Sequence, residues 1–248
     1  MAAERTPSTP RDGRQTRWDS HKVERRRQII EAALEIAQEN DPGTEIHVQE
    51  IAERAGLSRT VVYRHFADRA DLDRAVQAEI LEQVWNLLLP QISLHGTVPE
   101  IITRVISAYV QWAVDHPALH RLADHDLARD PGQESGPLEA GLDRIAERIS
   151  GLLMLALPSV GDHVDEAEMA ALIDPLVYGV VGAAFSSVRR WISRPVRVAT
   201  AEQVTGLVSE SIWFVIQGHA GLFGVDLTRQ TRAEDLVARV VATGSLPT

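Results

Sequence analysis

The hydrophobic positions of this chain recur at three- and four-residue spacing over long stretches, which is typical of amphipathic helices. Residues 22–39 show the pattern through Ile29, Ile30, Ala33, Leu34 and Ala37. Further helices are predicted over residues 71–89, 98–116, 118–128, 137–157, 165–193 and 200–221, with a short one near 231–242. No stretch of useful length alternates apolar and polar residues as a strand would. The pattern therefore predicts an all-α fold.

Residues 46–72 predict two short helices joined by a tight turn, the arrangement of a helix-turn-helix. The apolar face of the first helix consists of Val48, Ile51, Ala52 and Ala55. Gly56 stands where a left-handed residue ends that helix, and the Ser58 hydroxyl can cap the start of the next one. Val62 and Phe66 are expected to face the interior because they lie one helical turn apart.

The outward side of the second predicted helix carries hydrogen-bond donors, hydroxyls and methyl groups. An arginine can read a base edge, a valine methyl suits a thymine methyl, and tyrosine and histidine can meet phosphates. The residues expected to contact double-stranded DNA are Lys22, Arg26, His47, Val48, Ser58, Arg59, Thr60, Val61, Tyr63, Arg64, His65 and Arg69. The alternative is a helix-turn-helix that never touches DNA, with a surface that is merely solvated.

The segment AERAGLSRTVVYRHFADRADL resembles, in order and spacing, the signature of the TetR family of bacterial one-component transcriptional regulators. The resemblance covers roughly residues 25–75, and it departs from the family pattern at His47 and at the pair Thr60–Val61. It implies a DNA-binding head followed by a larger helical domain that binds an effector and dimerises. It also implies a homodimer, more often a repressor than an activator, that a small molecule releases from a palindromic operator.

The net charge of −10 is concentrated downstream of the predicted head. Residues 1–75 hold 13 basic and 14 acidic groups, whereas residues 76–248 hold 12 and 21. The first thirty residues hold eight basic groups against four acidic ones, so a basic arm can approach phosphates on an acidic protein. The expected organisation is a disordered basic arm over residues 1–21, a DNA-binding domain over 22–70 and an effector-binding and dimerisation domain over 71–248.

Composition argues against several classes of protein. The chain has no cysteine, which excludes disulfides, thiolate metal sites and thiol-based redox sensing. It shows neither an uninterrupted apolar run of transmembrane length nor a signal-peptide pattern, which predicts a cytoplasmic protein without a membrane partner. Motifs of common enzymes are missing, so we expect no enzyme and no cofactor. A helical interaction module without DNA binding remains as a third class.

The second predicted domain offers aromatic and aliphatic side chains suited to an apolar effector. The candidates for the pocket are Val105, Tyr109, Trp112, His120, Leu122, His125, Leu152, Met154, Tyr178 and Phe185, although the same residues would equally form an ordinary core. A polar cluster, His116, His120, Asp124, His125 and Asp126, keeps a metal-responsive regulator as an alternative. Pro117 argues against placing the first two histidines on one helical face, so no metal ligand is assigned.

The two longest late helices are the expected dimer surface, because small residues let helices approach closely. The expected interface residues are Leu176, Gly179, Val180, Ala183, Ser187, Trp191, Trp213, Ile216, Gln217 and Ala220. These faces would otherwise make an intrachain core.

Overall fold

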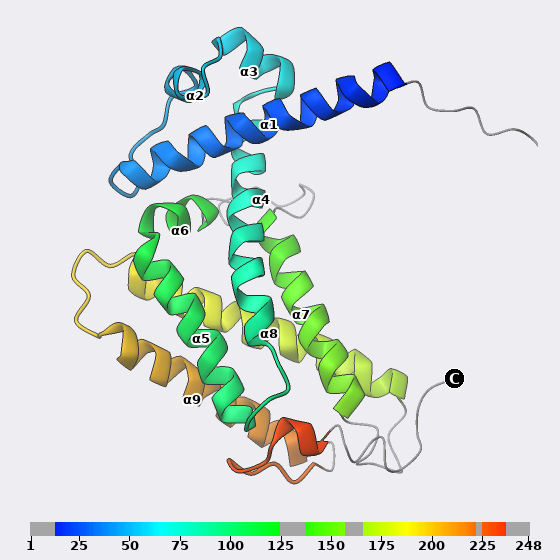
Figure 1. The fold of residues 1–248 in the computed structure, drawn as a ribbon. Coiled ribbons are helices and arrows are strands. Elements are labelled where there is room, and N and C mark those ends of the chain that lie inside the picture. The colour runs from blue at the N-terminus through cyan, green and yellow to red at the C-terminus, as the bar shows by residue number, and fades with distance from the viewer. Residues whose placement is uncertain (1–12, 125–136, 157–165, 222–224, 237–248) are drawn as a thin grey trace, which may run out of the picture. The chain divides into compact units, whose positions relative to one another are not determined.

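The computed structural model describes residues 13–124, 137–156, 166–221 and 225–236, which form two compact units. The first unit spans Met1–Val76 and the second spans Gln77–Thr248. Helix α4 (Arg69–Leu88) contains the boundary and therefore belongs to both units. The described residues are helical, as predicted, and the β-type pairing among them is an isolated bridge between Thr97 and Arg232 (Figure 1).

The first unit consists of α1 (Gly13–Glu39), α2 (Val48–Arg54), α3 (Arg59–His65) and the beginning of α4. Its core is formed by fully buried side chains, among them Ile29, Ile51, Val62, Phe66 and Leu72. The first helix was predicted to begin at residue 22, but α1 already begins at Gly13. Residues 13–21 are therefore helical and not part of a disordered arm, while residues 1–12 lie outside the described residues.

The turn between α2 and α3 follows the predicted local chemistry. Gly56 has a φ of +66°, and a Cβ built there would meet no atom within 4 Å. The need for glycine is therefore conformational and not steric, since residues with a Cβ rarely adopt this φ. Ser58 is the N-cap of α3, and its hydroxyl accepts a hydrogen bond from the Val61 backbone N–H at 3.4 Å. These two residues fix where α3 starts.

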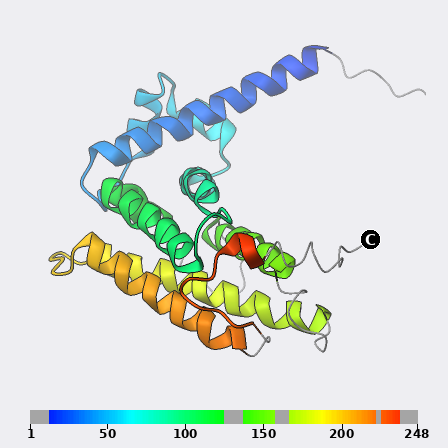
Figure 2. The same cartoon turned by 60° about the horizontal axis from the view of Figure 1, so that its bottom comes forward.

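Among the described residues, the second unit contains the end of α4 and the elements that follow it. These are η1 (Leu89–Gln91), α5 (Val98–Asp115), α6 (Pro117–Asp124), α7 (Pro137–Ala156), α8 (Glu166–Ile192) and α9 (Ala201–Ala220). Helix α5 packs along α9, α7 packs along α8, and α8 also contacts α9 and α5 (Figures 1 and 2). Residues 233–236 are helical and begin the short helix predicted near 231–242, whose remainder lies outside the described residues, as does the predicted end of α6.

Among the described helices, the segment Ala171–Ile192 of α8 is long and apolar enough to cross a membrane by length and composition alone, with a mean hydropathy of 1.6. The sequence analysis did not single it out because Asp174, Arg189 and Arg190 interrupt the apolar run. The segment packs against α5, α7 and α9, and core helices of globular domains satisfy the same test. We therefore describe it as a helix of the second unit.

Candidate functional site

The exposed face of α3 gathers the groups that could read DNA. Arg59, Thr60 and Arg64 are exposed, and Tyr63 exposes 39% of its side chain. The Arg59 guanidinium lies 5.6 Å from the centre of the Tyr63 ring, so the two side chains share one side of the helix. A hydroxyl, a phenol and two guanidinium groups on one short exposed helix form a surface rich in hydrogen-bond donors.

A surface recess lies beside this face, between the start of α2 and α3. It is lined by His47, Val48, Gln49, Glu50, Arg59, Tyr63 and Arg69. His47 is the N-cap of α2, and its backbone N–H donates to the Glu50 carboxylate at 3.0 Å. The His47 side chain remains largely exposed, with Glu45 3.7 Å away. His47 and Arg59 therefore lie around one recess from different helices.

Three residues predicted to contact DNA make contacts within the first unit. Arg26 donates to the His65 carbonyl at 2.7 Å, lies 3.5 Å from the Asp71 carboxylate and stacks 4.1 Å above the Phe66 ring. Its guanidinium ties α1 to the ends of α3 and α4.

Arg69 donates to the Asp73 carboxylate at 2.8 Å and to the Ile46 carbonyl at 2.6 Å. Val48 is only 8% exposed. Arg26 and Arg69 thus have partners within the unit and Val48 is buried, while their contacts with DNA stay predictions.

His65, predicted to contact a phosphate, is partly buried, and that contact stays a prediction. Its Nδ1 atom is buried and has no hydrogen-bond partner within the described part of the chain. Burial lowers the pKa of His65, and the nearby positive charges of Lys22 and Arg26 lower it further. The imidazole is therefore neutral at neutral pH and offers a phosphate no charge. Lys22 itself is exposed on α1.

The second unit encloses a cavity of about 350 Å³ between α4, α5, α7, α8 and α9. Four of the predicted pocket residues line it: Val105, Tyr109, Leu152 and Phe185. Trp112, Leu122, His120 and Tyr178 do not line it, and the side chains of His125 and Met154 lie outside the described residues. The sequence analysis missed the wall that α4 supplies through Leu81, Val84, Trp85 and Leu88, although the helical spacing of these residues was visible.

Two buried polar side chains meet near the wall of this cavity. The Tyr109 hydroxyl lies 2.9 Å from His120 Nε2, and the two residues are only 6% and 2% exposed. Phe185 stacks on both rings, with ring centres 5.7 Å and 5.8 Å away. His116, by contrast, stacks on Trp112 and donates from Nδ1 to the Trp112 carbonyl at 3.1 Å. Trp112 also lies beside His120, with ring centres 6.2 Å apart.

The predicted metal alternative gains no support from the described residues. No group of three or more histidine, aspartate or glutamate side chains in the part that the structure describes could hold a metal ion. His125, Asp126 and the side chain of Asp124 lie outside that part.

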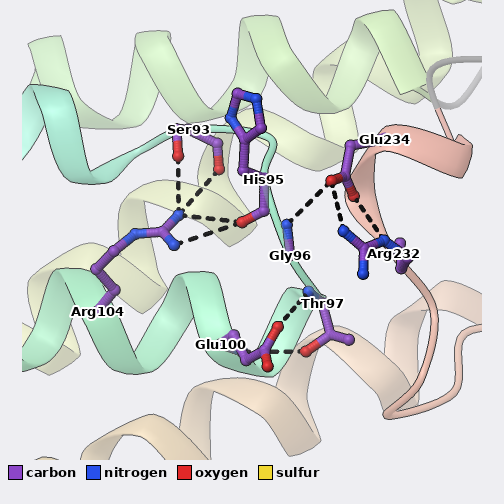
Figure 3. Close-up of polar contacts among 8 residues, drawn as sticks. All are labelled: Ser93, His95, Gly96, Thr97, Glu100, Arg104, Arg232 and Glu234. Atoms are coloured by element: carbon purple, nitrogen blue, oxygen red, sulfur yellow. Dashed lines mark hydrogen bonds and ion pairs between the residues drawn. The ribbon is translucent and has the colours of Figure 1, made fainter.

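One side of the cavity is lined by a clasp, which we define as the loop 92–97 together with the segment 225–236; Figure 3 shows its polar contacts. The Arg104 guanidinium holds the loop by donating to the Ser93 hydroxyl at 2.9 Å and to backbone carbonyls of the loop. The segment then pairs with the loop, since the Ala233 N–H donates to the Gly96 carbonyl at 3.0 Å.

The two parts of the clasp are also joined through side chains. Glu234 accepts from the Gly96 N–H at 3.4 Å and from Arg232 at 2.8 Å, and Arg232 lowers the pKa of Glu234 to about 2. Gly96 has a φ of +98°, and a Cβ there would lie 2.8 Å from the Glu100 carboxylate. Glycine is therefore required at this position. The sequence contains no local signal for the clasp, because its two parts are far apart in the chain.

The residues predicted for the dimer interface divide between the interior and the surface. Leu176, Val180, Ile216 and Ala220 line the cavity, and Trp213 is buried in a core cluster with Ala220 and Leu227. Trp213 and Ala220 are thus buried within one chain, whereas the interface role of the half-buried Leu176, Val180 and Ile216 stays a prediction. Gly179, Ala183, Ser187 and Gln217 are exposed, and Trp191 is half-buried and donates to the Ala199 carbonyl at 2.9 Å.

Apolar positions are exposed on the same two helices, among them Gly179 and Ala183 of the predicted interface. We call these positions the α8–α9 face: Leu172, Gly179 and Ala183 on α8, and Leu207, Phe214 and Val215 on α9. Leu207 and Phe214 are 70% and 61% exposed, although large apolar side chains are usually buried. Helices α8 and α9 contact each other, so the two rows are neighbours.

Comparison with known proteins connects both units to one kind of protein. Residues 29–76 match the family model described as bacterial regulatory proteins, tetR family. The chain is 28% identical over 223 residues, 87% of this chain and 88% of the relative, to an uncharacterized HTH-type transcriptional regulator found in two strains of Mycobacterium tuberculosis.

Two solved structures extend the likeness to the fold of the whole chain. A TetR-family transcriptional regulator from Streptomyces coelicolor is 22% identical, with a TM-score of 0.58 and coverage of 89% of both chains. The structure of RolR in complex with resorcinol is 16% identical, with a TM-score of 0.53, and covers 93% of this chain and 98% of that one.

Proposed function

We propose that this chain, whose N-terminal domain belongs to the TetR family of bacterial regulatory proteins, is a cytoplasmic homodimeric repressor that a small apolar molecule releases from a palindromic operator. The observation that carries the proposal is the presence of two separate sites: a donor-rich exposed face on α3 and an enclosed apolar cavity in the second unit. A regulator of this kind needs one site for DNA and another for its signal.

The α3 face supports DNA binding for two reasons: its side chains can bind nucleic acid, and they are not part of the core of the unit. Arg59 and Arg64 are exposed, and neither takes part in the ion pairs found among the described residues. An exposed arginine can donate two hydrogen bonds to guanine in the major groove. Thr60 and Tyr63 can position the backbone through phosphate contacts. The core of the unit is formed by the opposite face of α3, so these side chains are not needed to fold it.

The cavity supports a small-molecule effector. Its volume of about 350 Å³ lies within the range of about 300–1,000 Å³ that is common for ligand pockets. The RolR structure, which shares the fold, contains resorcinol. Resorcinol is a ligand of that protein, and we carry over only the idea that a cavity in this fold can hold a small organic molecule.

The α8–α9 face supports a homodimer. A palindromic operator is read by two recognition helices related by a twofold axis, about 34–36 Å apart. The face offers exposed leucine and phenylalanine side chains beside small residues, which suits the close approach of helices from a second copy. Glu210 and Arg229 form an ion pair beside Phe214, so charged groups border the exposed apolar side chains, as they commonly do at the rim of an interface.

Helix α4 supports a route from the cavity to the DNA-binding unit. Residues 69–76 belong to the first unit, while Leu81, Val84, Trp85 and Leu88 of the same helix line the cavity. An effector that binds more tightly when α4 is displaced would favour a spacing of the two heads that does not fit the operator. Repression would then be lost by a shift of populations.

The proposal is tested by fluorescence anisotropy of the purified full-length protein with the DNA upstream of its own gene. We expect binding to that fragment in preference to random DNA of equal length, with an affinity that falls steeply as salt is raised. Equal binding to both DNAs would contradict a sequence-specific regulator, and no binding at low salt would favour the helical interaction module.

A further inference from the structure

The C-terminal part of the clasp, segment 225–236, contacts both the cavity and the α8–α9 face. We infer that this segment couples the two places, so that a change at the wall of the cavity alters the affinity of the chain for a second copy of itself. The inference rests on the proposed function, because it assigns a regulation to the proposed homodimer. Arg229 is the positioning residue through which the segment acts on the interface.

The cavity side of the segment is apolar and closely packed. Leu227, Ala233 and Leu236 line the cavity, and the first two are only 8% and 5% exposed. Leu227 also packs in the core cluster that contains Trp213. A molecule in the cavity would contact these side chains. Because close-packed interiors transmit displacements, such a molecule would bias the position of the segment.

The same segment also contacts the α8–α9 face through Arg229, which follows Leu227 by two residues. Its guanidinium donates to the Glu210 carboxylate of α9 at 2.9 Å. It lies 5.9 Å from the centre of the Phe214 ring and 5.6 Å from the centre of the Trp213 ring. Phe214 belongs to the α8–α9 face and is 61% exposed. One short segment therefore touches the wall of the cavity and the border of the proposed interface.

The segment is attached to the loop 92–97 by hydrogen bonds that can open locally. The Ala233 N–H donates to the Gly96 carbonyl at 3.0 Å, and the Val98 N–H donates to the Thr231 carbonyl at 3.3 Å. Glu234 accepts from the Gly96 N–H (Figure 3). Local opening of such a segment costs less than unfolding of the whole domain, so the helices can stay folded when it opens.

The contacts of Arg229 depend on their exposure to water. Exposed ion pairs and cation–π contacts are weak, and both become stronger when water is excluded. In one copy the side chains of Arg229 and Glu210 are 46% and 48% exposed. A second copy that covers Phe214 would shield these contacts and hold the segment more firmly. By reciprocity, a displaced segment lowers the affinity of the two copies for each other.

Hydrogen exchange of the full-length protein, without DNA or effector, tests the coupling. The native dimer is compared with Ala183→Glu, which places a carboxylate on α8, leaves the residues around Arg229 unchanged and should be monomeric in sedimentation. Peptides covering 92–98 and 229–236 should exchange at least about fivefold faster in the monomer. Peptides from the first unit, which contains no residue of the face, should exchange equally and serve as the control.

The outcomes separate the coupling from the interface itself. A folded monomer whose clasp exchanges at the rate of the native dimer would overturn the inference and leave the proposed interface intact. An Ala183→Glu protein that stays folded and dimeric would overturn the proposed interface and the inference with it. Operator binding enters neither result, because no DNA is present.

Two variants within the segment test the role of Arg229, each made with and without Ala183→Glu. Arg229→Gln should weaken the dimer about fivefold and remove the difference in clasp exchange between dimer and monomer. Arg232→Gln is the matched control, because Arg232 pairs with Glu234 inside the segment and not with α9. It should speed clasp exchange by the same factor in dimer and monomer. A difference that persists in Arg229→Gln, or disappears in Arg232→Gln, would overturn the assignment.

The cavity side is tested by Leu227→Ala, measured by sedimentation over a range of protein concentrations. The truncation loosens the segment and should raise the dissociation constant of the dimer about threefold or more, although Leu227 is not on the α8–α9 face. Leu152→Ala is the matched control, because Leu152 lines the cavity from α7, and it should leave the constant unchanged. Circular dichroism checks that both variants are folded. An unchanged constant for folded Leu227→Ala, or equal weakening in both variants, would show that the segment does not connect the cavity to the dimer.

Discussion

Replacement of Phe214 by glutamate tests whether the homodimer forms through the α8–α9 face. Phe214 is 61% exposed on α9, so the side chain contributes little to the fold of one copy. The Arg229 guanidinium lies 5.9 Å from its ring centre, which gives a glutamate at this position a nearby cation. The monomer should therefore fold normally, while the dimer would have to bury two carboxylates related by the twofold axis.

The expected effect follows from the exposed area. A phenylalanine side chain buries roughly 200 Å² when fully covered, so the partner would cover about 120 Å² of each Phe214. At about 25 cal/mol per Å² this burial contributes about 3 kcal/mol per copy and about 6 kcal/mol per dimer. Loss of that contribution raises the dissociation constant of the dimer by a factor of about 10⁴. Desolvation of the carboxylates would raise it further.

The assay is sedimentation velocity over a range of protein concentrations, with thermal unfolding measured on the same samples. Val198→Glu is the matched control, because Val198 is also apolar and is 91% exposed, but lies in the loop between α8 and α9. We expect a monomer for Phe214→Glu and a dimer for the control. A Phe214→Glu protein that stays folded and dimeric at the lowest concentration would refute the assignment of the interface to this face.

The remaining predictions concern the DNA-binding unit and the cavity. Arg59→Ala should cost about 1–3 kcal/mol of binding free energy with the operator and relax sequence preference, as measured by anisotropy on specific and random DNA. Arg148→Ala removes the same charge from α7 and should change neither property. Equal losses of affinity for both DNAs in Arg59→Ala would show that Arg59 does not read a base. Tyr63→Phe should instead weaken binding to all DNA sequences alike. The folded state lowers the pKa of His65, so the unfolded chain takes up its proton first as pH falls. The stability of the first unit should therefore decrease below about pH 6.5. In chemical denaturation, the stability of His65→Gln should depend less on pH than that of the native protein over about pH 7 to 5. Val105→Trp should fill the cavity and abolish the response to effector in a reporter assay, while operator affinity stays within a few-fold of that of the native protein. Loss of operator binding with a retained response would place the effector site elsewhere.

The sequence by itself determined the features that depend on neighbouring residues. The turn at Gly56 and the N-cap at Ser58 follow from backbone conformation and one local hydrogen bond, so the positions of α2 and α3 could be predicted from a few residues. Hydrophobic periodicity located α5, α7, α8 and α9 to within about two residues. The beginning of α1 was missed, because residues 13–21 are polar and lack the apolar stripe that marks a packed helix.

Only the tertiary structure decided what each apolar face packs against and which polar groups are already engaged. Periodicity showed that α8 and α9 have apolar positions, but not that Leu176 and Ile216 would turn toward a cavity while Phe214 turns outward, because both kinds of position satisfy the same spacing. The structure alone showed that Arg26 donates to the His65 carbonyl, 39 residues away. The clasp joins Gly96 and Glu234, which are 138 residues apart, and no local pattern records such a contact. Long-range burial and hydrogen bonding therefore assigned these residues, since side chains with the same local preferences take different roles according to what the fold places beside them.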